Sequence, residues 1–282
     1  VVSLAPDRDV LRDAHLELAS IWDERLDDPA RALVSLQAVL SLEADHPQGL
    51  RRLALLSART GDLDKAATTL RRLVEVSRSA SDRAEAFVLL SQIQAKRGDD
   101  EAARNAALHA VTLSGPGGIG VERHRTLIEG NADWQAHADA LRTWVESSSN
   151  PLARRTARFE IARIMSEELK RPSRAVEELE LAVREQPTDV ELRRVLAVNL
   201  RLAGHCDEAA AELRRVIDDH PTKPELWREL ARTHQSANQP EAMRRALMPL
   251  ALLGEATPQE QQEIAGYVSR PGQAAAGSLE GS

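Results

Sequence analysis

A recurring spacing of Gly, Ala and Leu restricts this chain more than any other feature. Gly61 is followed five residues later by Ala66 and then by Leu70. The same spacing starts again at Gly204 and, with Ala in place of Leu, at Gly98. An internal repeat of this kind indicates an array of similar units, each of which buries its apolar face against its neighbours.

The residues between these turns have helical spacing. Leu50, Leu53, Ala54 and Ser57 fall at i, i+3, i+4 and i+7, which places them on one face of a helix. We find no run of alternating β-branched residues, so the sequence offers no strands for an α/β fold. Aromatic residues make up only 2% of the chain, and the abundant small residues suit helices that approach closely. The sequence therefore predicts an all-α fold.

The fullest unit is residues 190–223, VELRRVLAVNLRLAGHCDEAAAELRRVIDDHPTK. Its Leu196 and Ala197 stand at positions 7 and 8 of 34, its Ala209 at position 20 and its Pro221 at position 32. This pattern resembles the tetratricopeptide repeat (TPR), in which helix A and helix B of each unit pack through small residues at 8 and 20. The resemblance implies a right-handed α-α superhelix, because a single pair cannot bury its own face.

The same frame covers most of the chain as seven units and a final helix. That helix can begin with Thr257 as N-cap, Pro258 at N1 and Glu260 as capping-box partner. Residues 270–282 are rich in Gly, Ala and Ser and are predicted to be disordered. The predicted units are residues 12–46, 47–80, 84–117, 118–151, 155–189, 190–223 and 224–256, within a single solenoid over residues 1–269 that ends in a capping helix at about 257–269.

Two deviations from the frame are informative. The unit at 118–151 is degenerate, with His124, Arg125 and His137 where Leu, a small residue and Ala belong. The segments WDERLDDPARA (22–32) and MSEELKRPSRA (165–175) match each other 143 residues apart. Units therefore pair at about 71–72 residues, which resembles a class of long bacterial multi-TPR proteins.

The stretch GPGGIG, residues 115–120, satisfies the dinucleotide-binding pattern G-x-G-x-x-G. A nucleotide fingerprint must follow a strand, whereas this stretch follows the predicted helix EAARNAALHAVTLS. We therefore interpret it as an inter-repeat turn, and its glycine content predicts a hinge at 115–120.

The charge and hydropathy of the chain indicate which classes of partner to expect. The net charge of −7 does not favour nucleic-acid binding, and no apolar run reaches the length of about 20 residues that a membrane helix needs. Neither nucleic acid nor a membrane is therefore an expected partner, and we expect a cytoplasmic protein. The chain begins at Val1, which is typical of an excised fragment.

No motif of a known catalytic or cofactor site is present, such as G-x-x-x-x-G-K-[ST], H-E-x-x-H or G-x-S-x-G. The row His205-Cys206-Asp207-Glu208 offers metal-ligating side chains, but adjacent residues of a tight turn rarely converge on one ion. The single cysteine excludes an intrachain disulfide. We expect no enzyme activity, no cofactor and no metal.

Helix A positions that line the concave groove of TPR arrays carry arginines here, whose planar guanidinium suits carboxylates or phosphates. An alternative is that Glu191, Glu225 and Glu229 neutralise them in a structural network. The predicted partner-binding residues are Arg51, Arg59, Phe159, Arg163, Arg194, Arg201, Arg228 and Arg232.

The sequence thus predicts a non-catalytic scaffold or adaptor that binds a protein or peptide, with an acidic segment as the favoured ligand. Two alternatives stay open. The chain could be the TPR portion of a larger enzyme or signalling protein, or a sensor of a peptide or small ligand. The asparagines of the chaperone-binding carboxylate clamp are absent from the matching positions. No residue pattern points to a particular oligomeric state.

Overall fold

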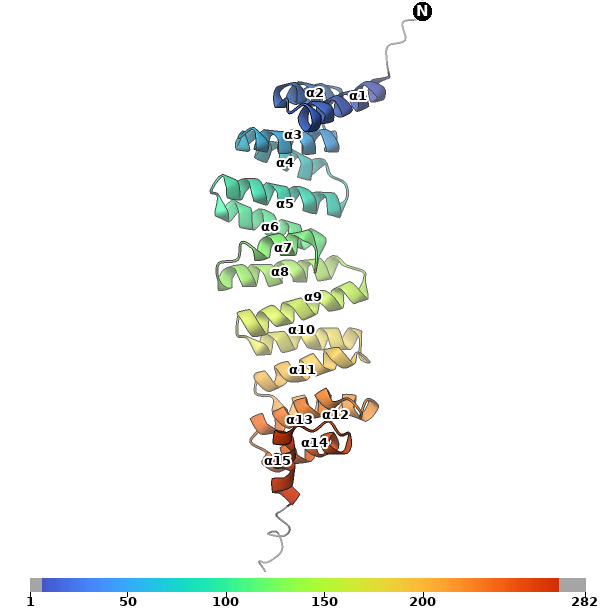
Figure 1. Ribbon diagram of the computed structural model, residues 1–282, viewed down its shortest axis with the longest axis vertical. Coiled ribbons are helices and arrows are strands. Elements are labelled where there is room, and N and C mark those ends of the chain that lie inside the picture. Colours follow the sequence, from blue (N-terminus) through green and yellow to red (C-terminus); the bar gives the residue numbers. More distant parts are fainter. Residues whose placement is uncertain (1–6, 269–282) are drawn as a thin grey trace, which may run out of the picture. The chain divides into compact units, whose positions relative to one another are not determined.

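The structure is a computed structural model that describes residues 7–268, and every regular element within this range is a helix (Figure 1). The predicted all-α fold is confirmed. The elements follow one another as seven antiparallel helix pairs and one last helix. Their bounds are α1 Arg8–Ser20, η1 Ile21–Arg25, α2 Pro29–Leu42, α3 Pro47–Arg59, α4 Leu63–Val76, α5 Ala80–Lys96, α6 Asp100–Ser114, α7 Ile119–Arg125, α8 Asn131–Ser147, α9 Pro151–Arg163, η2 Ile164–Glu168, α10 Pro172–Glu185, α11 Val190–Leu202, α12 Cys206–Asp219, α13 Pro224–Ser236, α14 Pro240–Leu252 and α15 Pro258–Val268.

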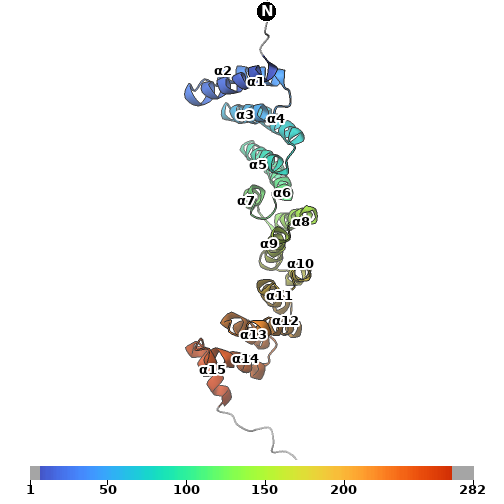
Figure 2. The same ribbon diagram turned by 90° about the vertical axis from the view of Figure 1, so that its right-hand side faces the viewer.

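The contacts of the chain divide it into two compact units, residues 1–157 and 158–282. In the first unit α1 packs on α2, α3 on α4 and α5 on α6, while α7 and α8 both pack on α6. In the second unit η2 packs on α10, α11 on α12 and α13 on α14, and α15 packs on α14. Figure 2 shows the same pairs from the side.

Helix starts depart from the 34-residue frame by a helical turn in the first, third and fifth pairs. α1, α5 and α9 each begin four residues before the predicted start of their units, whereas α3, α11 and α13 begin at the predicted residue. Two of these early starts have their own N-caps. At the start of α5, Ser79 accepts a hydrogen bond from the backbone N–H of Asp82 at 3.0 Å, and at the start of α9, Asn150 accepts one from that of Leu152 at 3.1 Å. The residues that the frame left between units therefore form an additional helical turn.

The turn inside each of six pairs contains one residue with positive φ. Glycine adopts this left-handed conformation without steric strain, and Asn and Asp tolerate it better than most residues. The Gly of the sequence pattern thus provides a positive φ in the turn, and in the other pairs an Asp, a Lys or an Asn adopts the same conformation. The six residues are Asp27, Gly61, Gly98, Lys170, Gly204 and Asn238.

A π-helical turn precedes Asp27 and another precedes Lys170, in the two matching segments 143 residues apart. Leu26 donates its N–H to the carbonyl of Ile21 at 3.1 Å, and the same contact recurs at Leu169 at 3.0 Å. A π-turn accommodates one additional residue within a helix. It therefore absorbs the extra residue that the sequence frame assigned to the turn of the first unit.

Alanines at position 20 are fully buried in the core. Ala32, Ala66, Ala103, Ala175 and Ala209 are each 0% exposed. Their small side chains let helix B approach helix A, and leucines at neighbouring positions fill the remaining space. In the first unit Ala32 belongs to a cluster of buried residues around α1–α3, and Ala66 belongs to one around α3–α6.

The glycine-rich turn lies between α6 and α7, so it follows a helix as predicted. A Cβ on Gly120 would lie 2.3 Å from the carbonyl carbon of Ala110, and one on Gly115 would lie 2.2 Å from the ring of Trp144. Gly115 also has positive φ. Close approach to α6 and α8 therefore explains these two glycines, while the hinge stays a prediction.

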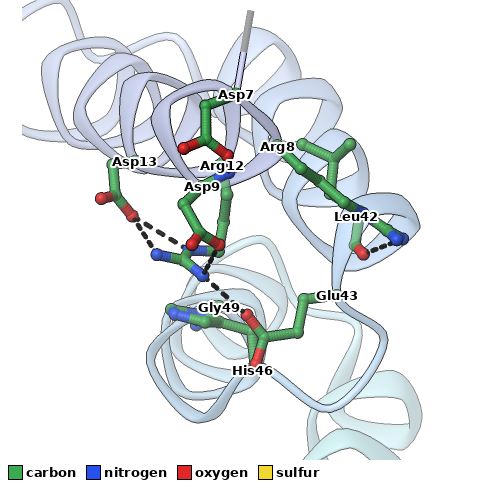
Figure 3. A network of polar contacts seen from close by, with 9 residues as sticks. All are labelled: Asp7, Arg8, Asp9, Arg12, Asp13, Leu42, Glu43, His46 and Gly49. Carbon is green, nitrogen blue, oxygen red and sulfur yellow. Dashed lines mark hydrogen bonds and ion pairs between the residues drawn. The ribbon is translucent and has the colours of Figure 1, made fainter.

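A polar network connects α1 with the end of α2, and a separate contact caps the start of α3 (Figure 3). Arg12 pairs with Asp9 at 2.8 Å, with Asp13 at 2.9 Å and with Glu43 at the end of α2 at 3.1 Å. His46 caps the N-terminus of α3. Its Nδ1 accepts from the N–H of Gly49 at 3.1 Å.

Residues 270–282, predicted to be disordered, lie outside the described residues. Among the helices that the structure describes, none combines the length and the hydropathy needed to cross a membrane.

Candidate interaction surface

The predicted groove residues lie on the first helix of each pair, which we call helix A. Arg51 and Arg59 are in α3 of the first unit, and Phe159 and Arg163 are in α9. The other four are in α11 and α13, two helices of the second unit that contact each other. We call these four the arginine surface: Arg194, Arg201, Arg228 and Arg232.

Glu229 of α13 pairs with two members of the arginine surface, Arg232 and Arg201, and its charge acts on a third, Arg194. It is 8% exposed and accepts a hydrogen bond from Nη1 of Arg232 at 2.6 Å. Its second oxygen lies 3.8 Å from Nη2 of Arg201. The hydrogen bond with Glu191 and the charges of Glu229 and Glu225 raise the pKa of Arg194. A buried carboxylate thus anchors arginines that come from two helix pairs.

Arg194 has its own bidentate partner. Its Nε and Nη2 donate to the two oxygens of Glu191 at 2.9 and 2.7 Å, within α11. A bidentate pair fixes the plane of the guanidinium and leaves its remaining donors pointing away from the carboxylate.

Arg228 connects α13 with α15. Its Nε donates to Oε1 of Glu260 at 2.9 Å, and its Nη2 donates to the carbonyl of Glu255 at 2.6 Å. Glu260 also accepts from the N–H of Thr257 at 2.8 Å, while Thr257 Oγ1 accepts from the N–H of Glu260 at 3.3 Å. The predicted capping box is therefore present. The hydrogen bond from Arg228 lowers the pKa of Glu260 below its usual range.

A cleft of about 270 Å³ lies beside Arg228 and Arg232, between α13, α14 and α15. Its wall combines these cationic side chains with the carboxylates of Glu260 and Glu263 and with apolar side chains. The apolar lining residues are Ala231, Met243 and Leu247.

The arginines outside the arginine surface also have carboxylate partners. Arg51 pairs with Glu85 of α5 at 2.6 Å, and Arg59 pairs with Asp23 of η1. Arg163 pairs with Glu160 in its own helix at 3.1 Å. Ion pairs of the kind that the alternative interpretation requires are thus present, with Glu191 and Glu229 among the partners. Phe159 is half-buried.

Two features escaped the sequence interpretation. A cleft of about 500 Å³ lies between α10, α11 and α12, lined by Arg193, Glu212 and Arg215 among others. His124 and His137, noted only as departures from the repeat, form a buried pair. Their occurrence at two apolar positions of one unit was the signal that could have found them.

The row of candidate metal ligands does not gather around one point. His205 Nδ1 lies 3.3 Å from Glu208 Oε1. Within residues 7–268, no three His, Cys, Asp or Glu side chains are grouped as a metal site would require.

Part of the chain matches a known protein family. Residues 23–77 match the family model described as Tetratricopeptide repeat. A search of curated proteins found no match. Among solved structures, the TPR2AB domain of yeast Sti1, solved as a pHSP90 complex, is similar at 15% identity over 93% of this chain and 100% of that one, with a TM-score of 0.37.

Two more solved structures are similar. A tetratricopeptide repeat protein from Parabacteroides merdae matches at 14% identity over 91% of this chain and 98% of that one, with a TM-score of 0.40. YrrB, described as a TPR protein with an unusual peptide-binding site, matches at 14% identity over 83% and 97%, with a TM-score of 0.35. These matches carry no inference about what this chain binds.

Proposed function

We propose that this chain, a tetratricopeptide-repeat protein, is a non-catalytic interaction scaffold that binds an acidic peptide segment on its arginine surface. The observation that carries the proposal is the cleft between α13, α14 and α15, which has Arg228 and Arg232 in its wall. Arg232 keeps 60% of its side chain exposed despite its bond to Glu229, so its remaining donors can reach a ligand.

The carboxylates around these arginines affect how a peptide can bind. A peptide carboxylate has to compete with Glu229 or Glu260, or bond to donors that these residues leave unused. Glu229 is held in the protein and buried, so it keeps the guanidinium groups of Arg201 and Arg232 in place before a ligand arrives. Preorganisation of this kind lowers the entropy that binding loses.

The test is binding of peptides rich in Asp and Glu, with the same peptides carrying Asn and Gln as reference. We expect the acidic set to bind with an affinity that falls as salt rises, because exposed charges are screened. Arg232→Ala should weaken binding by about fivefold to tenfold, equivalent to about 1 kcal/mol.

Arg174→Ala is the matched control. Arg174 is 64% exposed and pairs with Glu177 at i+3, but it lies on α10, outside the arginine surface. Equal binding of the acidic and amide peptides, or equal losses in both variants, would contradict the proposal.

A further inference from the structure

The fourth helix pair contains two buried histidines. His124 of α7 and His137 of α8 stand where the repeat has Leu and Ala, and both side chains are 0% exposed. Their Nδ1 atoms are 2.9 Å apart, and the ring centroids are 5.0 Å apart. Polar rings at two apolar positions thus bond to each other across the pair.

The distance restricts the protonation state of both rings. One Nδ1 has to donate a proton and the other has to accept it, so the acceptor ring is the Nε2–H tautomer. If both Nδ1 atoms carried protons, two N–H groups would face each other and the bond would be lost. The contact therefore requires that at least one ring stay neutral.

Burial also opposes the first added proton. Nε2 of His124 is buried without a hydrogen-bond partner, so a charge on this ring would lack compensation. Burial is the main reason that the pKa of His124 is lowered to about 4. The unfolded chain takes up this proton near pH 6.5.

Two charged groups act on His124 within the described residues. Asp133 of α8 raises its pKa, and Arg104 of α6 lowers it. Arg104 lies 3.7 Å from Asp133 and 3.2 Å from Glu129, the residue before the turn into α8. The effects of Asp133 and Arg104 on the pKa of His124 oppose each other, and the effect of burial is larger than either. Ser91 of α5 accepts a hydrogen bond from Nε of Arg123 in α7 at 2.9 Å, but Ser91 carries no charge.

The element that carries His124 has little stability of its own. α7 has seven residues and no side-chain N-cap, and isolated helices of this length are unstable in water. It depends on packing against α5 and α6. Loss of the bond between the histidines therefore acts on the shortest α-helix of the first unit.

We infer that His124 and His137 form a pH-sensitive latch, which holds α7 and α8 together at neutral pH and releases α7 when the pair is protonated. The direction of the pH dependence follows from the linkage between proton binding and folding. A histidine that the fold keeps neutral stabilises the closed state above pH 6.5, and this stability is lost progressively as pH falls toward 4.

Amide hydrogen exchange on the whole chain, from about pH 7 to about pH 4.5 and corrected for intrinsic rates, tests this inference. The opening constant of α7 should rise by up to about tenfold per pH unit below about pH 6.5. Amides of α3 and α4 in the same unit should not show this rise. An opening constant of α7 that does not change with pH would overturn the inference.

The double variant His124→Leu/His137→Ala restores the residues of the other units and should abolish the dependence. His205→Gln, at an exposed histidine of the second unit, should keep it. The same dependence in the double variant would overturn the latch.

If the double variant does not fold, NMR of the wild-type imidazoles decides. We expect one Nδ1–H and one Nε2–H tautomer near neutral pH, with His124 titrating well below 6.5. Two rings that titrate at the ordinary value would equally overturn the latch.

Discussion

Arg228 of α13 donates a hydrogen bond to Glu260 of α15 across 2.9 Å, and the same Glu260 closes the capping box with Thr257. One carboxylate thus fixes the start of the last helix and ties it to the preceding pair. Among the described elements α15 packs on α14, and these polar contacts add to that packing.

Glu260→Ala should release the start of α15. The loss of a capping partner and of one partly buried ion pair predicts a destabilisation of α15 by about 1–2 kcal/mol. Hydrogen exchange of the α15 amides measures this directly. Glu263→Ala on the same helix is the control, because Glu263 lies 3.8 Å from Arg244 and takes no part in the cap. Equal effects of the two variants would contradict the role given to Glu260.

The protection of α15 should also depend on pH. The fold lowers the pKa of Glu260, so the contribution of this group is complete above the unfolded value of about 4.3 and is lost as pH falls through the lower folded value. The same exchange experiment on Glu260→Gln should show no such loss. A loss of protection already near pH 6 would point to a different group.

Glu229→Gln should have opposite effects on stability and binding. Arg201 and Arg232 lose the carboxylate that holds them, which predicts a destabilisation of about 1–3 kcal/mol. The freed arginines should bind acidic peptides more tightly, because an internal competitor has been removed. Glu212→Gln is the control: Glu212 also bonds two arginines, Arg193 and Arg215, but lies on α12. Weaker peptide binding by Glu229→Gln would contradict the competition between Glu229 and a peptide carboxylate.

Gly120→Ala should destabilise the packing of α7 on α6. The added Cβ would overlap the backbone of Ala110, and backbone cannot move aside as a side chain can. We expect a loss of about 2–3 kcal/mol in chemical unfolding monitored at α7. Gly130→Ala is the matched control, since nothing lies within 4 Å of its Cβ position. A neutral Gly120→Ala would show that α7 is free to shift.

The hinge predicted at residues 115–120 requires amide protection well below that of α6. Gly117 is where such motion would start, because a Cβ there would meet nothing within 4 Å, in contrast to Gly115 and Gly120. Hydrogen exchange at neutral pH, where the latch is closed, measures this turn separately from the release of α7. Protection equal to that of α6 would contradict the hinge.

The fold was predictable because its signals are local. Helical periodicity, the Gly of the inner turns and the capping box at Thr257 and Glu260 all connect residues that lie within a few positions of each other. Position 20 was predictable for a related reason: a small residue there is required in every unit, so the pattern repeats. The longer first helices were missed because their extra turns depend on the caps at Ser79 and Asn150, which a fixed 34-residue frame ignores.

The candidate sites were predictable only as residue types on a helix. By itself the sequence determined that the chain forms helix pairs, and that arginines occupy helix A and histidines replace apolar residues in one unit. Only the tertiary structure decided that Arg228 donates a hydrogen bond to Glu260, 32 positions later in the chain. Likewise, only the tertiary structure decided that the side chains of His124 and His137 contact each other and are buried from solvent. The physical reason is that charge pairing and burial depend on neighbouring elements, whose approach no local spacing specifies.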